Sequence, residues 1–74
     1  MEKIAEGISD FGDFKAILFR TSDGRHFVQI VPFKSLEKPH IEWLSGHDHL
    51  EWLRRLDTWA QIEHSKSQFL IKKN

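Results

Sequence analysis

The sequence of 74 residues contains no cysteine, so disulfide bonds cannot stabilise the fold. A domain of this size buries only about 60% of its unfolded surface, which leaves little margin against chain entropy. A metal, a partner or a second copy of the chain is therefore expected to supplement the core. Long apolar runs are also missing, and the acidic opening "MEKIAEGISD" lacks the apolar centre of a signal peptide. We expect a soluble, intracellular protein, cytoplasmic or nuclear, without membrane contact.

Motifs that carry chemistry are scarce. The four glycines are isolated, so no glycine-rich phosphate loop exists, and the serines lie at expected turns and helix caps. His47 and His49 are two residues apart, which points them away from each other on a helix and does not suit a metal. His49 is expected near the core with a hydrogen bond, and His26, His40 and His64 at the surface with His47. We expect no enzyme, no metal and no cofactor.

Net charge is zero, but the charges are unevenly distributed. Cations are in excess in residues 14–40, whereas anions are in excess in residues 1–13 and 41–64. A net charge of zero disfavours a strongly electrostatic nucleic-acid binder. If strands and helix lie on opposite sides, however, the molecule has a basic side and an acidic side.

A β-hairpin is predicted by the stretch "FKAILFRTSDGRHFVQIVPF", residues 14–33. Asp23-Gly24 favours a tight turn, because Gly24 can adopt a positive φ. With a three-residue loop, Phe19 opposes Phe27 and odd-numbered residues share one face; a two-residue loop shifts the register by one and mixes the faces. The odd face then contains Lys15, Ile17, Phe19, Phe27, Gln29, Val31 and Phe33. The even face contains Ala16, Leu18, Val28 and Ile30, which are suited to lie under a helix.

The hairpin is flanked by further elements. Residues 3–11 can form a strand by alternation, and "HIEWLSG", residues 40–46, favours a fourth short strand over the first turn of a helix. A helix is expected over about 46–64, started by Ser45 with Asp48 or by Asp48 with Glu51. Its apolar stripe consists of Trp52, Leu53, Leu56, Trp59 and Ala60.

Residues 65–74 are expected to form a short tail or a strand. The chain is thus expected to be one α+β domain over residues 1–74. An antiparallel three- or four-stranded meander sheet within residues 3–44 is followed by one amphipathic helix that packs on one face.

The odd face of the hairpin combines aromatic rings with cations. Such a surface can stack unpaired bases and hold phosphates, with about 1–3 kcal/mol for each stacked base. The alternative is that this face is a second core covered by another chain, because three phenylalanines are too apolar to leave in water. The residues expected to contact nucleic acid are Lys15, Phe19, Arg20, Arg25, Phe27 and Lys34.

The element order and two segments, "FGDFKAILFRTSDGRHFVQI" and "HIEWLSGHDHLEWLRRL", resemble the single-stranded nucleic-acid-binding modules of the transcriptional positive cofactor four family. The Whirly and Pur-alpha repeats are more distantly similar. The first segment looks like that family's paired strands, and the second like its last strand leading into a helix. The basic loop of the family is shortened here to "KSLEKP". The resemblance implies a homodimer formed largely through the helices, with the strands presented to a single strand.

These observations predict a homodimeric, non-enzymatic module that binds single-stranded DNA or RNA and acts in transcription regulation. The alternative is a small protein-interaction or inhibitor module, regulatory or phage-type, that uses the apolar face of the sheet on a protein target.

Overall fold

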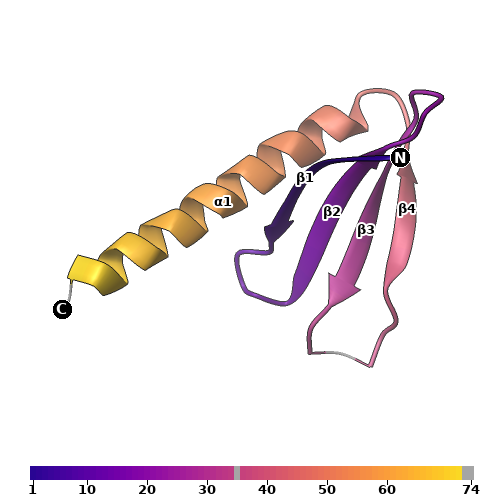
Figure 1. Ribbon diagram of the computed structural model, residues 1–74. Helices are drawn as coiled ribbons and strands as arrows, with labels where there is room; N and C mark the ends of the chain where they lie inside the picture. Colours follow the sequence, from indigo (N-terminus) through magenta and orange to yellow (C-terminus); the bar gives the residue numbers. More distant parts are fainter. Residues whose placement is uncertain (35, 73–74) are drawn as a thin grey trace.

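The chain folds into a four-stranded sheet followed by one helix (Figure 1). The computed structural model describes the backbone of residues 1–34 and 36–72 and the side chains as far as residue 66. The strands pair antiparallel in chain order, which confirms the predicted α+β meander. Within the described residues, no helix is long and apolar enough to cross a membrane. The elements are β1 (Glu2–Ile8), β2 (Phe14–Arg20), β3 (His26–Pro32), β4 (His40–Leu44) and α1 (Asp48–Lys72).

The β2–β3 hairpin has the register predicted for a three-residue loop. Phe19 lies opposite Phe27, so odd-numbered residues of the two strands share one face. The Gly24 N–H donates to the Thr21 carbonyl at 3.1 Å, and the Thr21 N–H donates to the Arg25 carbonyl at 2.8 Å. Gly24 has a φ of 88°, a left-handed conformation that glycine adopts without steric cost. The turn chemistry therefore determines which side chains lie on which face.

Helix α1 crosses the even face of the sheet and packs mainly on β1 and β2 (Figure 1). The close approach depends on Gly7 of β1, because a Cβ there would lie 3.2 Å from Cδ2 of Leu56. Trp59 packs edge-on against Phe14, with ring centres 5.7 Å apart. The buried cluster consists of Ala16, Leu18 and Val28 from the sheet with Leu56 and Trp59 from the helix. The even face is therefore the core face, as the pattern of small apolar residues predicts.

The two outer strands differ in regularity. The strand predicted within residues 3–11 is β1, and its register to β2 shifts between Lys3 and Ala5, which marks a β-bulge. Residues 40–44 form the strand that the sequence favoured over a helical turn.

A serine side chain holds the turn between β1 and β2. The buried hydroxyl of Ser9 accepts the N–H of Asp13 at 3.0 Å and that of Phe14 at 3.2 Å. These two hydrogen bonds hold the conformation of the turn.

The helix is longer than the sequence predicted. It begins at Asp48 and ends at Lys72, so the tail or strand expected from residue 65 onward is wrong as far as residue 72; residues 73–74 lie outside the described part. No glycine or proline interrupts residues 61–72, so nothing in the backbone stops the helix. Ala60, expected in the apolar stripe, is exposed, and Ile62 packs against the core in its place. The last turns of α1 extend beyond the sheet (Figure 1).

Candidate nucleic-acid interface

The face of the sheet opposite α1 is covered by no element among the described residues, and we call it the open face. The strand registers determine which side chains it presents, because residues paired across an antiparallel ladder lie on the same side. From β1 to β4 these are Lys3, Glu6, Ile8, Lys15, Ile17, Phe19, Phe27, Gln29, Val31, Ile41 and Trp43.

Three aromatic side chains form a continuous row across β2, β3 and β4, here called the aromatic row. Phe19 stacks on Phe27 with ring centres 5.1 Å apart, and Phe27 contacts Trp43 at 5.0 Å. The middle ring is only 7% exposed, because its two neighbours cover it, whereas Trp43 is 53% exposed at the end of the row. The aromatic surface that is available to a ligand is therefore centred on Trp43 and not on Phe27.

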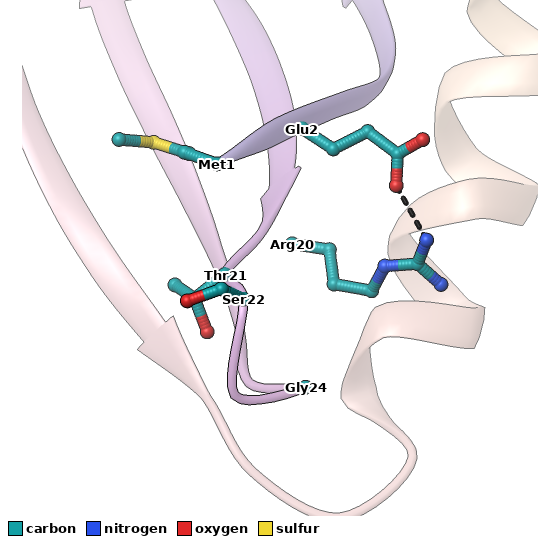
Figure 2. Close-up of a pocket in the computed structure, with 6 residues that line it drawn as sticks. All are labelled: Met1, Glu2, Arg20, Thr21, Ser22 and Gly24. Atoms are coloured by element: carbon teal, nitrogen blue, oxygen red, sulfur yellow. Dashed lines mark hydrogen bonds and ion pairs between the residues drawn. The ribbon is translucent and has the colours of Figure 1, made fainter.

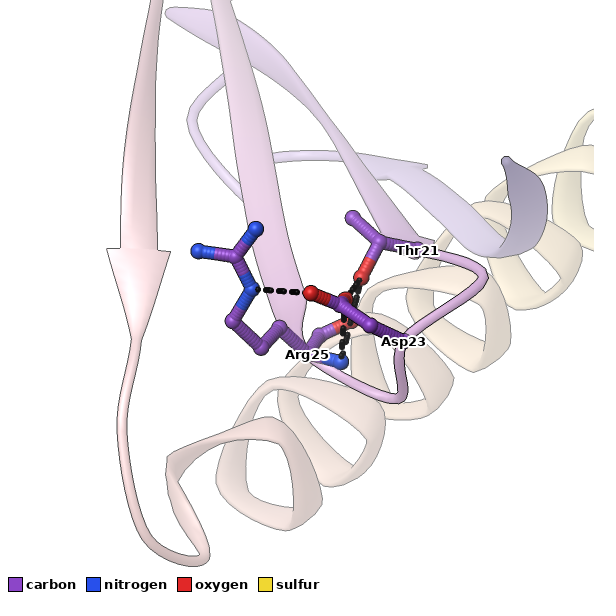
Figure 3. Close-up of polar contacts among 3 residues, drawn as sticks. All are labelled: Thr21, Asp23 and Arg25. Atoms are coloured by element: carbon purple, nitrogen blue, oxygen red, sulfur yellow. Dashed lines mark hydrogen bonds and ion pairs between the residues drawn. The ribbon is translucent and has the colours of Figure 1, made fainter.

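Arg25 links the β2–β3 turn to this exposed tryptophan. Its guanidinium carbon lies 4.7 Å from the centre of the Trp43 ring, a cation–π contact. Nε of the same side chain donates to Oδ2 of Asp23 at 2.9 Å (Figure 3). The Thr21 hydroxyl donates to that carboxylate, and this bond, together with the backbone N–H and the charge of Arg25, holds the pKa of Asp23 below its usual range. Asp23 therefore orients the cation over the ring.

Two lysines flank a single carboxylate on the β1 side of the open face. Nζ of Lys15 lies 2.9 Å from Oε2 of Glu6, and Nζ of Lys3 lies 3.0 Å from Oε1. The hydrogen bond from Lys15, followed by that from Lys3 and by the two charges, lowers the pKa of Glu6. All three groups are accessible to solvent, so a phosphate can compete with the carboxylate for either ammonium group.

The structure brings together four of the residues that the sequence predicted for nucleic-acid contact: Lys15, Phe19, Arg25 and Phe27. Arg20 belongs to the even-numbered set of β2 and lies on the α1 side, where it pairs with Glu2 (Figure 2). Lys34 is exposed in the loop after β3. Trp43 was not predicted: alternation within residues 40–44 places it with Ile41, but the pairing with Phe27 depends on a register that the local pattern does not contain.

The hollow in which Arg20 lies is open to solvent at the turn end of the sheet (Figure 2). Its wall is formed by the N-terminal residues and the β2–β3 turn, and the Glu2–Arg20 ion pair crosses it. Since the Glu2–Arg20 ion pair satisfies both charges, we do not regard the hollow as a candidate catalytic site. It is lined by Met1, Glu2, Arg20, Thr21, Ser22 and Gly24.

A pair of histidines connects β3 to the start of α1. The His26 and His49 rings stack with centres 4.0 Å apart and planes 4° apart, and both side chains are half-buried. His26 was expected at the surface, and the ring of His49, on the first turn of α1, covers part of it. Burial, followed by the charges of His49 and Arg20, lowers the pKa of His26. In the described part of the chain no group of three or more His, Asp or Glu side chains is arranged to hold a metal ion.

Comparisons with protein-family models, with curated proteins and with solved structures found no match to this chain. The geometry of the open face is therefore what indicates a function for this chain.

Proposed function

We propose that the protein binds single-stranded DNA or RNA, without catalysis, through the open face of its sheet. The observation that carries this proposal is the half-exposed Trp43 at the end of the aromatic row, with the Arg25 guanidinium over its ring. Every base has a π-face, so an exposed ring on a sheet accepts bases with little regard for sequence. Phe19 extends the aromatic surface, and Phe27 supports it by packing between the other two rings.

Cations lie on both sides of the aromatic row. Arg25 is at the turn end, Lys3 and Lys15 are on the β1 side, and Lys34 follows β3. In the free protein Glu6 forms ion pairs with Lys3 and Lys15, and Asp23 forms one with Arg25. A bound strand exchanges these carboxylates for phosphates, so the affinity is expected to be moderate and to decrease as salt rises.

An unpaired strand fits this face better than a duplex does. The bases of a duplex are stacked on one another, and their faces are not available to an aromatic side chain. No described helix lies on the open face to enter a groove, since α1 packs on the far side of the sheet. The stacking contribution is therefore expected to favour single strands.

The second candidate function is binding of a protein target by the same face. One observation favours it: Ile8 and Ile41 are also exposed on the open face, so the apolar surface extends beyond the aromatic row. A protein partner would use the apolar surface and would not need the cations. The two functions therefore differ in their response to salt and to charge reversal.

The test is a titration of fluorescently labelled single-stranded and duplex oligonucleotides, followed by anisotropy at low and moderate salt. Arg25→Glu is compared with Arg55→Glu, a matched control, because Arg55 lies 4.6 Å from the centre of the Trp52 ring on the helix. We expect salt-sensitive binding of the single strand that Arg25→Glu weakens at least about tenfold and that Arg55→Glu leaves almost unchanged. Equal effects of the two variants, or no binding at low salt, would reject the proposal and favour the protein target.

A further inference from the structure

The two edges of the sheet differ in how they are protected from another strand. β1 carries a β-bulge and the charged residues Glu2, Lys3 and Glu6, and α1 packs beside it. Each of these features discourages strand addition. β4 is paired with β3 without a register shift, contains neither lysine nor proline, and lies at the side of the sheet away from α1 (Figure 1). The edge at β4 is therefore the one open to pairing.

The hydrogen-bond pattern of the sheet determines which groups β4 offers. In β3 the odd-numbered residues bond to β2, because the Thr21–Arg25 pair is hydrogen-bonded and the Phe33 N–H donates to the Asp13 carbonyl at 3.0 Å at the other end of the ladder. Bonded directions alternate along a strand, so the even-numbered residues of β3 bond to β4.

The partners of those even-numbered residues in β4 are His40, Glu42 and Leu44. The main-chain N–H and C=O groups of Ile41 and Trp43 therefore point outward from the sheet edge. Both side chains are exposed as well, at 48% for Ile41 and 53% for Trp43. A short, regular strand with two outward-facing peptide groups and exposed apolar side chains is a template for a further strand.

A second copy of the chain complements this edge. In an antiparallel pair centred on Ile41, each Ile41 lies opposite its equivalent and the two exchange both main-chain hydrogen bonds. His40 of one copy then lies opposite Glu42 of the other, twice across the two-fold axis, and within one copy Nε2 of His40 already lies 3.6 Å from Oε1 of Glu42. Pairing centred on Glu42 instead places two carboxylates opposite each other, which is unfavourable.

We infer that β4 pairs antiparallel with β4 of a second copy, centred on Ile41, so that two sheets join into one continuous sheet. Trp43 N–H then donates to the carbonyl of Pro39 in the other copy, and the ladder ends there because proline has no N–H. The two open faces become neighbours on one surface. This interface differs from the helix-mediated dimer that the family resemblance implies, and it does not depend on what the open face binds.

Charge exchange across β4 provides the first test, measured by analytical ultracentrifugation without nucleic acid. His40→Glu places two carboxylates opposite each other, and Glu42→Lys removes the carboxylate that faces His40 of the other copy. Each is expected to raise the dimer dissociation constant, in the case of His40→Glu roughly tenfold. An equimolar mixture of the two variants restores complementary pairs, so it should form heterodimers at the affinity of the unmodified protein. A mixture that stays as weak as the single variants would overturn the inference.

Cross-linking provides the second test, because the chain contains no native cysteine to interfere. Ile41→Cys brings two thiols together at a hydrogen-bonded pair, where Cα atoms lie about 5.5 Å apart, within the range of a disulfide. Mild oxidation is expected to yield covalent dimer, whereas Lys3→Cys, on the same face at the β1 edge, yields none. A dimer that resists cross-linking through Ile41→Cys has another interface, such as the helices. A protein that is monomeric at all tested concentrations does not pair through β4. Either outcome contradicts the inference.

Discussion

The guanidinium of Arg25 lies over the ring of Trp43, and a carboxylate two residues earlier, that of Asp23, holds it there. This contact connects the tight turn between β2 and β3 to the outer strand β4, so the turn and the exposed end of the aromatic row are positioned together. A cation and an aromatic face at one place are the two groups that a nucleotide requires, since the phosphate and the base are neighbours along the strand. The proposed interface depends on this pairing more than on any single residue.

Removing the carboxylate that occupies the two lysines should strengthen nucleic-acid binding. Glu6→Gln releases Lys3 and Lys15 from the ion pairs that now hold them, and it raises the positive potential of the open face. We expect a several-fold higher affinity for single strands at low salt and a steeper dependence on salt. Glu51→Gln, on the first turn of α1, changes the net charge equally and serves as the control. If both variants bind equally, Lys3 and Lys15 do not contact phosphate.

Enlarging Gly7 should destabilise the fold, because α1 lies directly against this position. A Cβ at Gly7 would lie 3.2 Å from Leu56 and 3.6 Å from Trp59, so the further methyl groups of valine have no room without displacing the helix. We expect Gly7→Val to lower the free energy of unfolding by about 1–3 kcal/mol, measured by urea denaturation. Ile8→Val, on the opposite face of the same strand, should change it much less. Equal losses would mean that α1 does not pack closely on β1.

Replacing single rings of the aromatic row by alanine should show which ring stabilises the fold and which is available for binding. Phe27 is buried between two rings, and we expect Phe27→Ala to cost about 3–5 kcal/mol, a large part of the stability of a domain of this size. Trp43→Ala removes a half-exposed ring and should cost clearly less. Thermal unfolding of the two variants measures this difference. A Trp43→Ala variant that is as unstable as Phe27→Ala would make Trp43 a core residue, and its effect on binding could not then be interpreted.

Acid should weaken the attachment of the first helical turn to the sheet. The pKa of His26 in the folded protein is lowered from 6.5, because burial, the neighbouring His49 and Arg20 all disfavour its charged form. His47 lies near His49, and Glu2 pairs with Arg20 on the same side of the sheet. The contribution of His26 to the free energy of unfolding is therefore fully present above pH 6.5. It decreases as pH falls from that value toward the lowered pKa, and it does not change further below that pKa.

The measurement is the melting temperature between pH 8 and pH 5 for the unmodified protein and for His26→Phe. The phenylalanine can stack on His49 but cannot take up a proton, so this variant should lose less stability on acidification. Identical pH profiles for the two proteins would show that His26 does not cause the acid sensitivity.

The fold could be predicted from the sequence where the signal is local. Asp23-Gly24 and the three-residue loop determine the hairpin register, and that register determines which residues lie under α1. The end of the helix could not be predicted in the same way. The apolar stripe predicted from the sequence ends at Ala60, but no glycine or proline follows that would end the helix, and it continues to Lys72.

The candidate site was predictable only in part, because it combines strands that are distant in sequence. Alternation along β2 is sufficient to place Arg20 on the opposite face from Phe19, so its position away from the aromatic row was available from the sequence. The contact of Trp43 with Phe27 was not, since it requires the pairing of β3 with β4 across a connecting loop. The same pairing buries Phe27, so the accessible aromatic ring is that of Trp43 on β4.

The most direct test of the central claim is an amide-resolved NMR titration of the protein with a short single-stranded oligonucleotide. The Trp43 indole can be distinguished by substitution from those of Trp52 and Trp59, which pack on the core side. We predict that the Trp43 indole and the amides around Lys15, Phe19 and Arg25 shift together and saturably, while the exposed side of α1 stays unchanged. Shifts confined to α1, or none at millimolar oligonucleotide, would contradict the assignment of the open face as a nucleic-acid interface.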